Sequence, residues 1–282
     1  MLKNWTEFLS LADIQAIHDT SMELLNTVGI KFPQDEALHI FQEHGFKVDG
    51  ETVYMTEEQV MAAISSTPAG FTIHARNPQR DIQIGGGRPV FAPGYGAPFL
   101  VDFETGKRVP TLEDYHNLAK LAHALPHQDM SGHLMVEPQD IPSETANIQM
   151  LHANMIHSDK PFIGSTEGTA GANHTLEMIK ILFGEQDGEA RTCGLINSLS
   201  PLGFGSDMIE ALIAYARAHQ PVIVAALIMA GSTGPITLAG VLALQNAEQL
   251  AGIALTQLIN PGAPAIYGST STNIDMRTGA LA

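Results

Sequence analysis

The chain has 282 residues, 44% of them hydrophobic and 16% charged, which is enough for one α/β barrel or two ordinary domains with a large core. A formal net charge of −16 argues against nucleic acid and against an anionic membrane surface as partners. The single cysteine, Cys193, excludes a disulfide framework and fits a reducing cytoplasm, where it is expected as a buried, inert thiol.

Residues 1–87 predict a small α+β appendage. Helical spacing, capping residues and a two-residue turn give its elements, which are a helix over 11–28, a helix over 34–43, a hairpin over 46–55 turning at Asp49-Gly50, and a helix opened by the capping box Thr56-x-x-Gln59. An alternating segment, 71–84, then ends in Gly85-Gly86-Gly87. No Gly-Lys-Ser/Thr follows these glycines, so a hairpin corner is favoured over a phosphate loop.

From residue 88 onward, short apolar strands alternate with helical segments. Four strands begin near a proline and end in small or polar residues, in the runs RPVFAPGYG (88–96), KPFIGSTEG (160–168), QPVIVAALIMAG (220–231) and APAIYGSTST (263–272). Further strands are expected at 130–136 and 192–197. Strand, small-residue loop and helix in repetition predict parallel βα units, and residues 88–282 hold about six of them.

This repetition predicts the α/β class, as a TIM-type (β/α) barrel that lacks its last units, because eight units take about 250 residues. The sixth strand lacks its helix, so we expect the N-terminal part of a longer protein. An open doubly wound sheet remains an alternative, although no GxGxxG follows the first strand.

The carboxyl ends of such strands carry the chemistry, so the candidate residues are taken from there. We expect Glu137 and Glu167 as catalytic carboxylates, although each precedes a helix and could instead act as its cap. The expected substrate-binding residues are hydrogen-bonding side chains at the other strand ends, namely Tyr95, His133, Asn197, Ser269, Thr270 and Asn273. No metal site is expected, because His152 and His157 are five residues apart, not the four of an HExxH motif.

Several segments resemble the trimethylamine methyltransferase (MttB) family. They are IHDTSMELLNTVGIKF near the start, VYMTEEQVMAAI, the long run over 71–129, KPFIGSTEG and YGSTSTNIDMRTGALA. The resemblance implies a TIM barrel with an N-terminal appendage. It also implies transfer of a methyl group from trimethylamine, or from a quaternary amine such as glycine betaine, to the cobalt(I) of a corrinoid protein.

The resemblance further implies that the chain binds no cofactor directly, because the corrinoid (cobalamin) is carried by the partner protein. The family's pyrrolysine position lies beyond Ala282, so the choice of donor stays open. We also expect a homo-oligomer, a cytoplasmic location, no nucleic-acid or membrane partner, and no activity of residues 1–282 alone. The alternatives are a non-catalytic binding protein for betaine-like cations and an unrelated TIM-barrel lyase or hydrolase.

Overall fold

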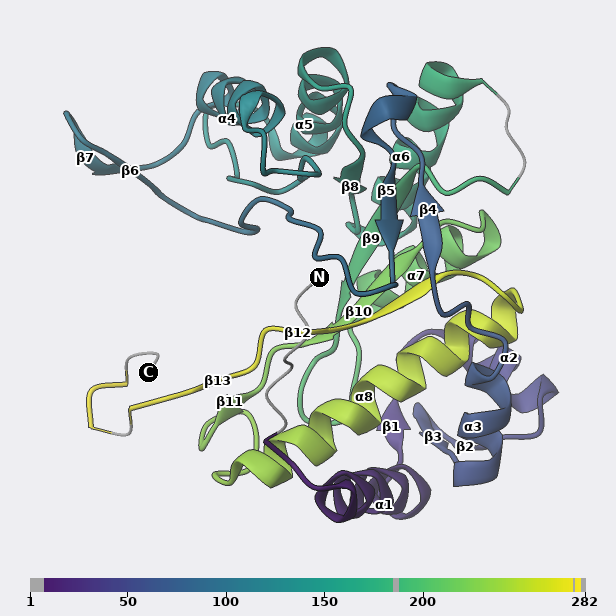
Figure 1. The fold of residues 1–282 in the computed structure, drawn as a ribbon. Coiled ribbons are helices and arrows are strands. Elements are labelled where there is room, and N and C mark those ends of the chain that lie inside the picture. The colour runs from purple at the N-terminus through teal and green to yellow at the C-terminus, as the bar shows by residue number, and fades with distance from the viewer. Residues whose placement is uncertain (1–7, 185–187, 276, 280–282) are drawn as a thin grey trace. The chain divides into compact units, whose positions relative to one another are not determined.

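The computed structural model describes residues 8–184, 188–275 and 277–279, and the chain divides into two compact units (Figure 1). Unit 1 combines Met1–Pro68, Ile196–Arg217 and Val222–Ala282, and unit 2 combines Ala69–Leu195 with Ala218–Pro221. Each unit therefore joins segments from both sides of residue 87. The division into residues 1–87 and 88–282 stays a prediction about the order of domains along the chain.

Unit 1 is built around one long helix. Its elements are α1 (Leu11–Thr27), β1 (Ile30–Lys31), α2 (Asp35–Glu43), β2 (Lys47–Asp49), β3 (Thr52–Tyr54), α3 (Glu57–Ile64), α7 (Ser206–Arg217), β10 (Val222–Ala226), β11 (Met229–Ala230), α8 (Leu238–Ile259), β12 (Ala265–Ser269) and β13 (Thr272–Asn273). Helix α8 contacts α1, α2, α3 and α7, as well as β10 and β12 (Figure 1). Most of its residues are buried, from Val241 to Gln257, so it is the core helix of this unit.

By length and apolar composition alone, α8 is also long enough to cross a membrane, which the sequence analysis did not anticipate. The buried core helix of a globular protein meets the same criterion, and two-thirds of the residues in this stretch of α8 are buried. Its packing against the other elements of unit 1 therefore accounts for its apolar character without a membrane.

The local signals in the first 64 residues predicted their elements well. The hairpin of β2 and β3 is antiparallel and pairs Val48 with Val53, but its two-residue turn is Gly50-Glu51, one residue later than predicted, because Asp49 pairs with Thr52. The capping box at the start of α3 is present, because Thr56 Oγ1 accepts the backbone N–H of Gln59 at 3.3 Å. Such caps satisfy amide groups that the first helical turn leaves without partners.

Unit 2 contains the middle of the chain. Its elements are β4 (Phe71–Ile73), the 3₁₀ turn η1 (Pro78–Arg80), β5 (Ile82–Ile84), β6 (Leu100–Asp102), β7 (Gly106–Arg108), α4 (Leu112–Ala124), α5 (Ser143–His157), β8 (Phe162–Gly164) and α6 (Gly168–Phe183). Strand β9 (Thr192–Asn197) begins in unit 2 and ends in unit 1.

The predicted α/β class with parallel strands is confirmed. In unit 1, β10 and β12 pair in parallel from Val222 opposite Ala265 to Ala226 opposite Ser269. In unit 2, β8 and β9 pair in parallel, with Ile163 opposite Cys193. Helix α6 connects β8 to β9, and helix α8 lies between β10 and β12 in the chain. Parallel strands need such crossover connections.

Two predicted strands differ from the structure. Residues 130–136 form no strand, and only Ser131 and Val136 make isolated parallel bridges, to Phe162 and Ala97. The predicted strand in 88–96 is also absent, and the first strand after it is β6, which forms an antiparallel hairpin with β7. An apolar run fits a strand only when a neighbouring strand presents unpaired backbone groups along its length, and these two segments lack such a partner within unit 2.

Helix α4 begins at a charged cap that yields a testable pH dependence. Asp114 accepts the backbone N–H of Thr111 at 2.8 Å and is held by Arg108 through two bonds of 2.6 and 2.7 Å. The Arg108 guanidinium holds the pKa of the Asp114 carboxyl well below its usual range. Because the pKa of Asp114 is lower in the folded protein than its ordinary value of 3.8, the ionised carboxylate stabilises the fold at pH values above 3.8. This stabilisation is lost as the pH falls below that value toward the native pKa.

We therefore expect Asp114→Asn to lower the free energy of unfolding by about 1 kcal/mol at neutral pH, because the bonds from Arg108 lose their charge assistance. Urea unfolding at neutral pH and near pH 3 measures the difference, which should shrink at the lower pH. Glu113→Gln, an exposed change in the same helical turn, is the control and should show little effect. An equal loss at both pH values would contradict the assignment.

Candidate functional site

The end of β8 brings a carboxylate to the surface of unit 2. Residues 161–166 are all buried, and Glu167 is the first exposed residue after them. Gly168 then takes φ 62°, a left-handed conformation that glycine adopts without strain, and α6 begins there. A buried strand followed by a tight turn therefore presents Glu167 at the carboxyl end of β8, where the sequence placed it.

Asn147, on α5, ties this strand end to the neighbouring helix. Its Nδ2 donates to Ser165 Oγ at 2.6 Å and to Glu167 Oε2 at 3.1 Å. Gly171 of α6 lies directly against this pair, since a Cβ there would be 2.6 Å from Ser165 Oγ. The orientation of Glu167 thus depends on three elements: β8, α5 and α6.

Tyr95 joins the same group from the loop before β6. Burial raises the pKa of Tyr95 to about 12, Thr166 opposes the shift with a side-chain hydrogen bond, and the Glu167 carboxylate adds to it. Tyr95 is therefore a neutral hydroxyl at physiological pH, near the one carboxylate of the group. Two of the predicted site residues, Tyr95 and Glu167, are brought together as expected.

His133 is a buried neutral imidazole beside Asn147. Burial lowers its pKa to about 4, and a hydrogen bond with the backbone of Asn147 opposes that shift. Its Nε2 atom is buried and has no hydrogen-bond partner within the described residues. Oδ1 of Asn147 is also buried and has no hydrogen-bond partner within the described residues. The imidazole therefore acts as a neutral hydrogen-bonding group at neutral pH, with no charge of its own.

The second predicted carboxylate lies in a different setting. Glu137 is exposed, and its carboxylate has no hydrogen bond or ion pair with the parts of the chain that the structure describes. It follows Val136, which bridges to Ala97 two residues after Tyr95. Its catalytic role stays a prediction, with no positioning contact to support it.

The other predicted residues belong to unit 1. Ser269 Oγ donates to Gln245 Oε1 at 2.5 Å, and Ser271 Oγ donates to the same atom at 2.8 Å. Beside them lies an open cavity of about 450 Å³ with apolar walls from α8, and Ser269 and Asn273 are among its lining residues. Thr270 is exposed, and its backbone N–H donates to Ala226 O at 3.0 Å. Asn197, at the end of β9, is half-buried.

Sequence reasoning missed the carboxylate that organises the loop after β9. Glu248 is fully buried and accepts bonds from Ser198 Oγ at 2.5 Å, Ser200 Oγ at 2.7 Å and the backbone N–H of Leu202 at 2.8 Å. Burial raises the pKa of Glu248, and the three donors oppose that shift. Its signal in the sequence was a single acid in the apolar stretch of α8. Asn147 and Gln245, which position predicted residues, were missed as well.

Two further residue classes bear on the chemistry. Cys193 is buried in β9, and burial raises its pKa to about 12, which confirms the predicted inert thiol. Across residues 8–184, 188–275 and 277–279, no three His, Cys, Asp or Glu side chains are grouped to hold a metal ion. The Tyr95–Glu167 group therefore offers one carboxylate among neutral donors, an arrangement suited to holding an organic cation.

Comparison with known proteins places the chain in a family. A family model described as trimethylamine methyltransferase (MTTB) matches residues 3–282. The chain is 51% identical over 271 residues to a glycine betaine methyltransferase of Desulfitobacterium hafniense, covering 95% of this chain and 57% of that protein. It is 33% identical to a trimethylamine methyltransferase MttB of another strain of that species, covering 94% of this chain and 54% of the relative.

A proline betaine:corrinoid methyltransferase of Eubacterium limosum is 30% identical, over 97% of this chain and 58% of its own length. Among solved structures, the monomethylamine methyltransferase MtmB of Methanosarcina barkeri matches with a TM-score of 0.55 at 12% identity, covering 93% of this chain and 60% of MtmB. That likeness concerns the fold alone. The chain spans somewhat more than half the length of these relatives. The matched residues and the identities together show that the chain belongs to the trimethylamine methyltransferase (MTTB) family.

Proposed function

We propose that this chain is part of a methyltransferase that moves a methyl group from a methylated amine to the cobalt(I) of a corrinoid protein, with glycine betaine as the preferred donor. The observation that carries the proposal is the 51% identity to a glycine betaine methyltransferase over 95% of the chain. The 33% identity to a trimethylamine methyltransferase makes trimethylamine the second choice.

The proposal extends to the fold and the assembly. The parallel strands would belong to a TIM-type (β/α) barrel, supported by the likeness to MtmB. The corrinoid would be the methyl acceptor, carried by its own protein, so it is a substrate of this reaction. We also propose a cytoplasmic homo-oligomer, and we expect residues 1–282 alone to be inactive, because the catalytic relatives are longer.

The chemistry asks for positioning more than for proton transfer. When a quaternary ammonium loses a methyl group, the C–N bonding pair stays on nitrogen and a neutral tertiary amine leaves, so no proton has to be supplied. The protein has to hold the cation in line with the acceptor and exclude water. The neutral Tyr95 and His133 fit this demand, since neither carries a charge at physiological pH.

Glu167 would attract the ammonium group of the donor. Its carboxylate is oriented by Asn147 and stands near Tyr95. The positive charge on nitrogen is greatest in the ground state and declines during transfer, so this attraction favours binding more than the chemical step. Glu167 is thus proposed as a substrate-binding carboxylate, and the sequence-based assignment of a catalytic role to Glu137 remains untested.

The deciding experiment measures methylation of a cobalt(I) corrinoid protein by the full-length enzyme with glycine betaine and with trimethylamine. A higher kcat/KM with glycine betaine supports the proposal. Faster turnover of trimethylamine would reverse the choice of donor. Saturable binding of betaine with no methyl transfer would favour a cation-binding protein instead.

For the variant Glu167→Gln we expect KM for the quaternary donor to rise about fivefold, with kcat changed less than threefold, because a screened ion pair near a protein surface contributes about 1 kcal/mol. Steady-state kinetics of the full-length enzyme provides both constants. Glu177→Gln, an exposed change on α6, the helix that follows Glu167, is the matched control. A fall in kcat with KM unchanged would show that Glu167 acts in the transition state instead.

A further inference from the structure

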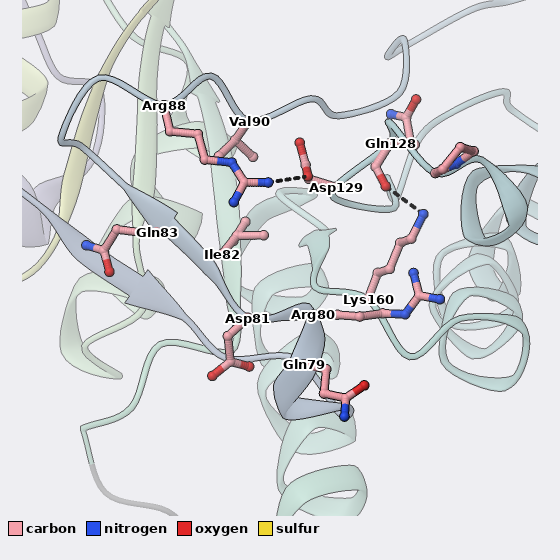
Figure 2. A pocket seen from close by; sticks show the side chains of 11 residues that line it. Gln79, Arg80, Asp81, Ile82, Gln83, Arg88, Val90, Gln128, Asp129 and Lys160 are labelled. Carbon is pink, nitrogen blue, oxygen red and sulfur yellow. Dashed lines mark hydrogen bonds and ion pairs between the residues drawn. The ribbon is translucent and has the colours of Figure 1, made fainter. Parts of the chain in front are cut away.

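A second polar site lies in unit 2, at the opposite end of β8 from Glu167. It is a cavity of about 210 Å³ between η1, β5, the loop at Arg88 and the segment after α4 (Figure 2). Lys160, which lines it, comes just before β8, whereas Glu167 comes just after that strand. A cavity of this size has room for a small ion and several water molecules.

The cavity is bordered by three cationic side chains in a protein whose net charge is −16. They are Arg80, Arg88 and Lys160. The Lys160 side chain is only 5% exposed, and its ammonium donates to the backbone oxygens of Ala122, Leu125 and Gln128 at 2.7, 2.9 and 2.6 Å. Figure 2 shows the last of these bonds. The partners are neutral carbonyls, so they satisfy its hydrogen bonds without cancelling its charge.

The pKa of Lys160 reflects the absence of a carboxylate bonded to its ammonium group. Burial lowers its pKa first, and the positive charge of Arg80 lowers it further, while Asp129 and Asp159 oppose the shift from a distance. Arg80 is itself paired, with its Nε 2.9 Å from Asp159. Arg80 and Lys160 therefore repel each other at the edge of one cavity, and an anion bound between them would relieve this repulsion.

The two carboxylates that line the cavity, Asp81 and Asp129, already have partners in the backbone and in other side chains. Asp81 accepts the N–H of Ala75 at 2.8 Å and bonds the ring of His74 at 2.7 Å. Asp129 accepts the N–H of Phe91 at 2.9 Å and is 3.8 Å from Arg88, a loose pairing shown in Figure 2. Neither acid is a close partner of Lys160.

One donor at the cavity has no partner. Nε2 of Gln128 is buried and makes no hydrogen bond with the described residues, and Gln128 lines the cavity. Leaving such a donor unsatisfied costs about 1–3 kcal/mol, so a rotation of the Gln128 side chain that brings Nε2 to a ligand in the cavity would be favoured. The group that accepts from an amide and also balances Arg80, Arg88 and Lys160 is an oxyanion.

We propose that the cavity lined by Arg80, Arg88, Gln128 and Lys160 binds a small oxyanion of the size of phosphate, at the end of β8 away from the proposed methyl-transfer site. Arg88 and Arg80 would contact the ion, Gln128 Nε2 would donate to it, and Lys160 would contribute charge from behind. The inference does not rest on the proposed function, because its readout is binding.

The test is calorimetric titration of the full chain with inorganic phosphate at constant ionic strength, alongside thermal unfolding, with acetate as a second probe. We expect saturable binding and a saturable rise in Tm for the wild type. Arg88 is 80% exposed, so Arg88→Gln should fold normally and raise Kd at least tenfold. Gln128→Glu would put a carboxylate into the cavity and should abolish binding.

Arg217→Gln is the matched control, because it removes the same charge from an exposed ion pair with Glu36 in unit 1. It should bind phosphate as the wild type does. Phosphate also stabilises proteins by exclusion from their surfaces, which gives an unsaturated rise in Tm common to all variants. That common rise, with no heat of binding, would overturn the proposal. Binding of acetate in place of phosphate would retain the site and assign it to carboxylates.

Discussion

Replacing Glu248 by alanine is expected to lower the free energy of unfolding by about 3–5 kcal/mol. The change removes the acceptor of three bonds and leaves the Ser200 hydroxyl and the N–H of Leu202 without their partner inside unit 1. Each buried donor left unsatisfied costs about 1–3 kcal/mol, and the lost side chain adds a cavity. Urea unfolding of wild type and variant gives the difference directly.

Glu248→Gln is the matched control for this prediction. Its amide oxygen can still accept from Leu202, and the serine hydroxyls can rotate to accept from its NH₂ group. We therefore expect a loss of less than about 1.5 kcal/mol at neutral pH. A loss as large as that of alanine would show that the charge itself, and not hydrogen bonding, holds the loop after β9.

The difference in stability between the wild type and Glu248→Gln should depend on pH in a definite direction. Burial raises the pKa of Glu248 above its ordinary value of 4.5, so the ionised carboxylate is less favoured in the folded protein than in the unfolded chain. A raised pKa contributes stability that is present below the ordinary value and lost as the pH rises through the native one. The wild type should therefore gain stability over Glu248→Gln as the pH falls toward 4.5. If the wild type instead lost stability relative to Glu248→Gln as the pH falls, the three hydrogen-bond donors would outweigh burial in setting the pKa of Glu248.

Local signals in the sequence predicted local structure, because a cap or a turn needs only neighbours in the chain. The predicted hairpin over 46–55 and the capping box at Thr56 are both present, although the hairpin turns at Gly50-Glu51 and not at Asp49-Gly50. The start of α5 is less readable from the sequence: Ser143 is a residue type that often caps helices, but it is the first helical residue, and Pro142 precedes it with no side-chain cap. A helix start in Pro-Ser-Glu offers two adjacent positions, and the sequence does not decide between them.

Non-local contacts decided what the sequence could not predict. The run 130–136 is apolar enough for a strand, but only Ser131 and Val136 find partners. Glu248 acts on residues about fifty positions earlier in the chain, so its role becomes visible only when α8 packs beside the loop after β9. The position of Glu167 was predictable because it ends a clear strand, whereas Asn147, which orients it, has no local signature on α5.

Gly171→Ala is expected to lower kcat/KM of the full-length enzyme about a hundredfold while leaving the protein folded. A Cβ at this position would lie 2.6 Å from Ser165 Oγ and 2.8 Å from Asn147 Nδ2, so the Asn147–Ser165 bond has to open and Glu167 has to move with it. A displacement of about 1 Å at a reacting centre can cost a hundredfold in rate. The gain in helix propensity, about 1 kcal/mol, offsets part of the packing strain.

The matched control is Gly205→Ala, because a Cβ there meets no atom within 4 Å and its backbone is unstrained. It should retain activity. Adding Ser165→Ala to Gly171→Ala removes the atom in closest contact and should restore part of the rate if steric displacement is the cause. Full activity of Gly171→Ala would instead show that the group at the end of β8 is not part of the catalytic site. Thermal unfolding distinguishes loss of activity in a folded variant from loss through unfolding, and a double variant that regains its Tm without regaining activity would contradict steric displacement of Glu167 as the cause.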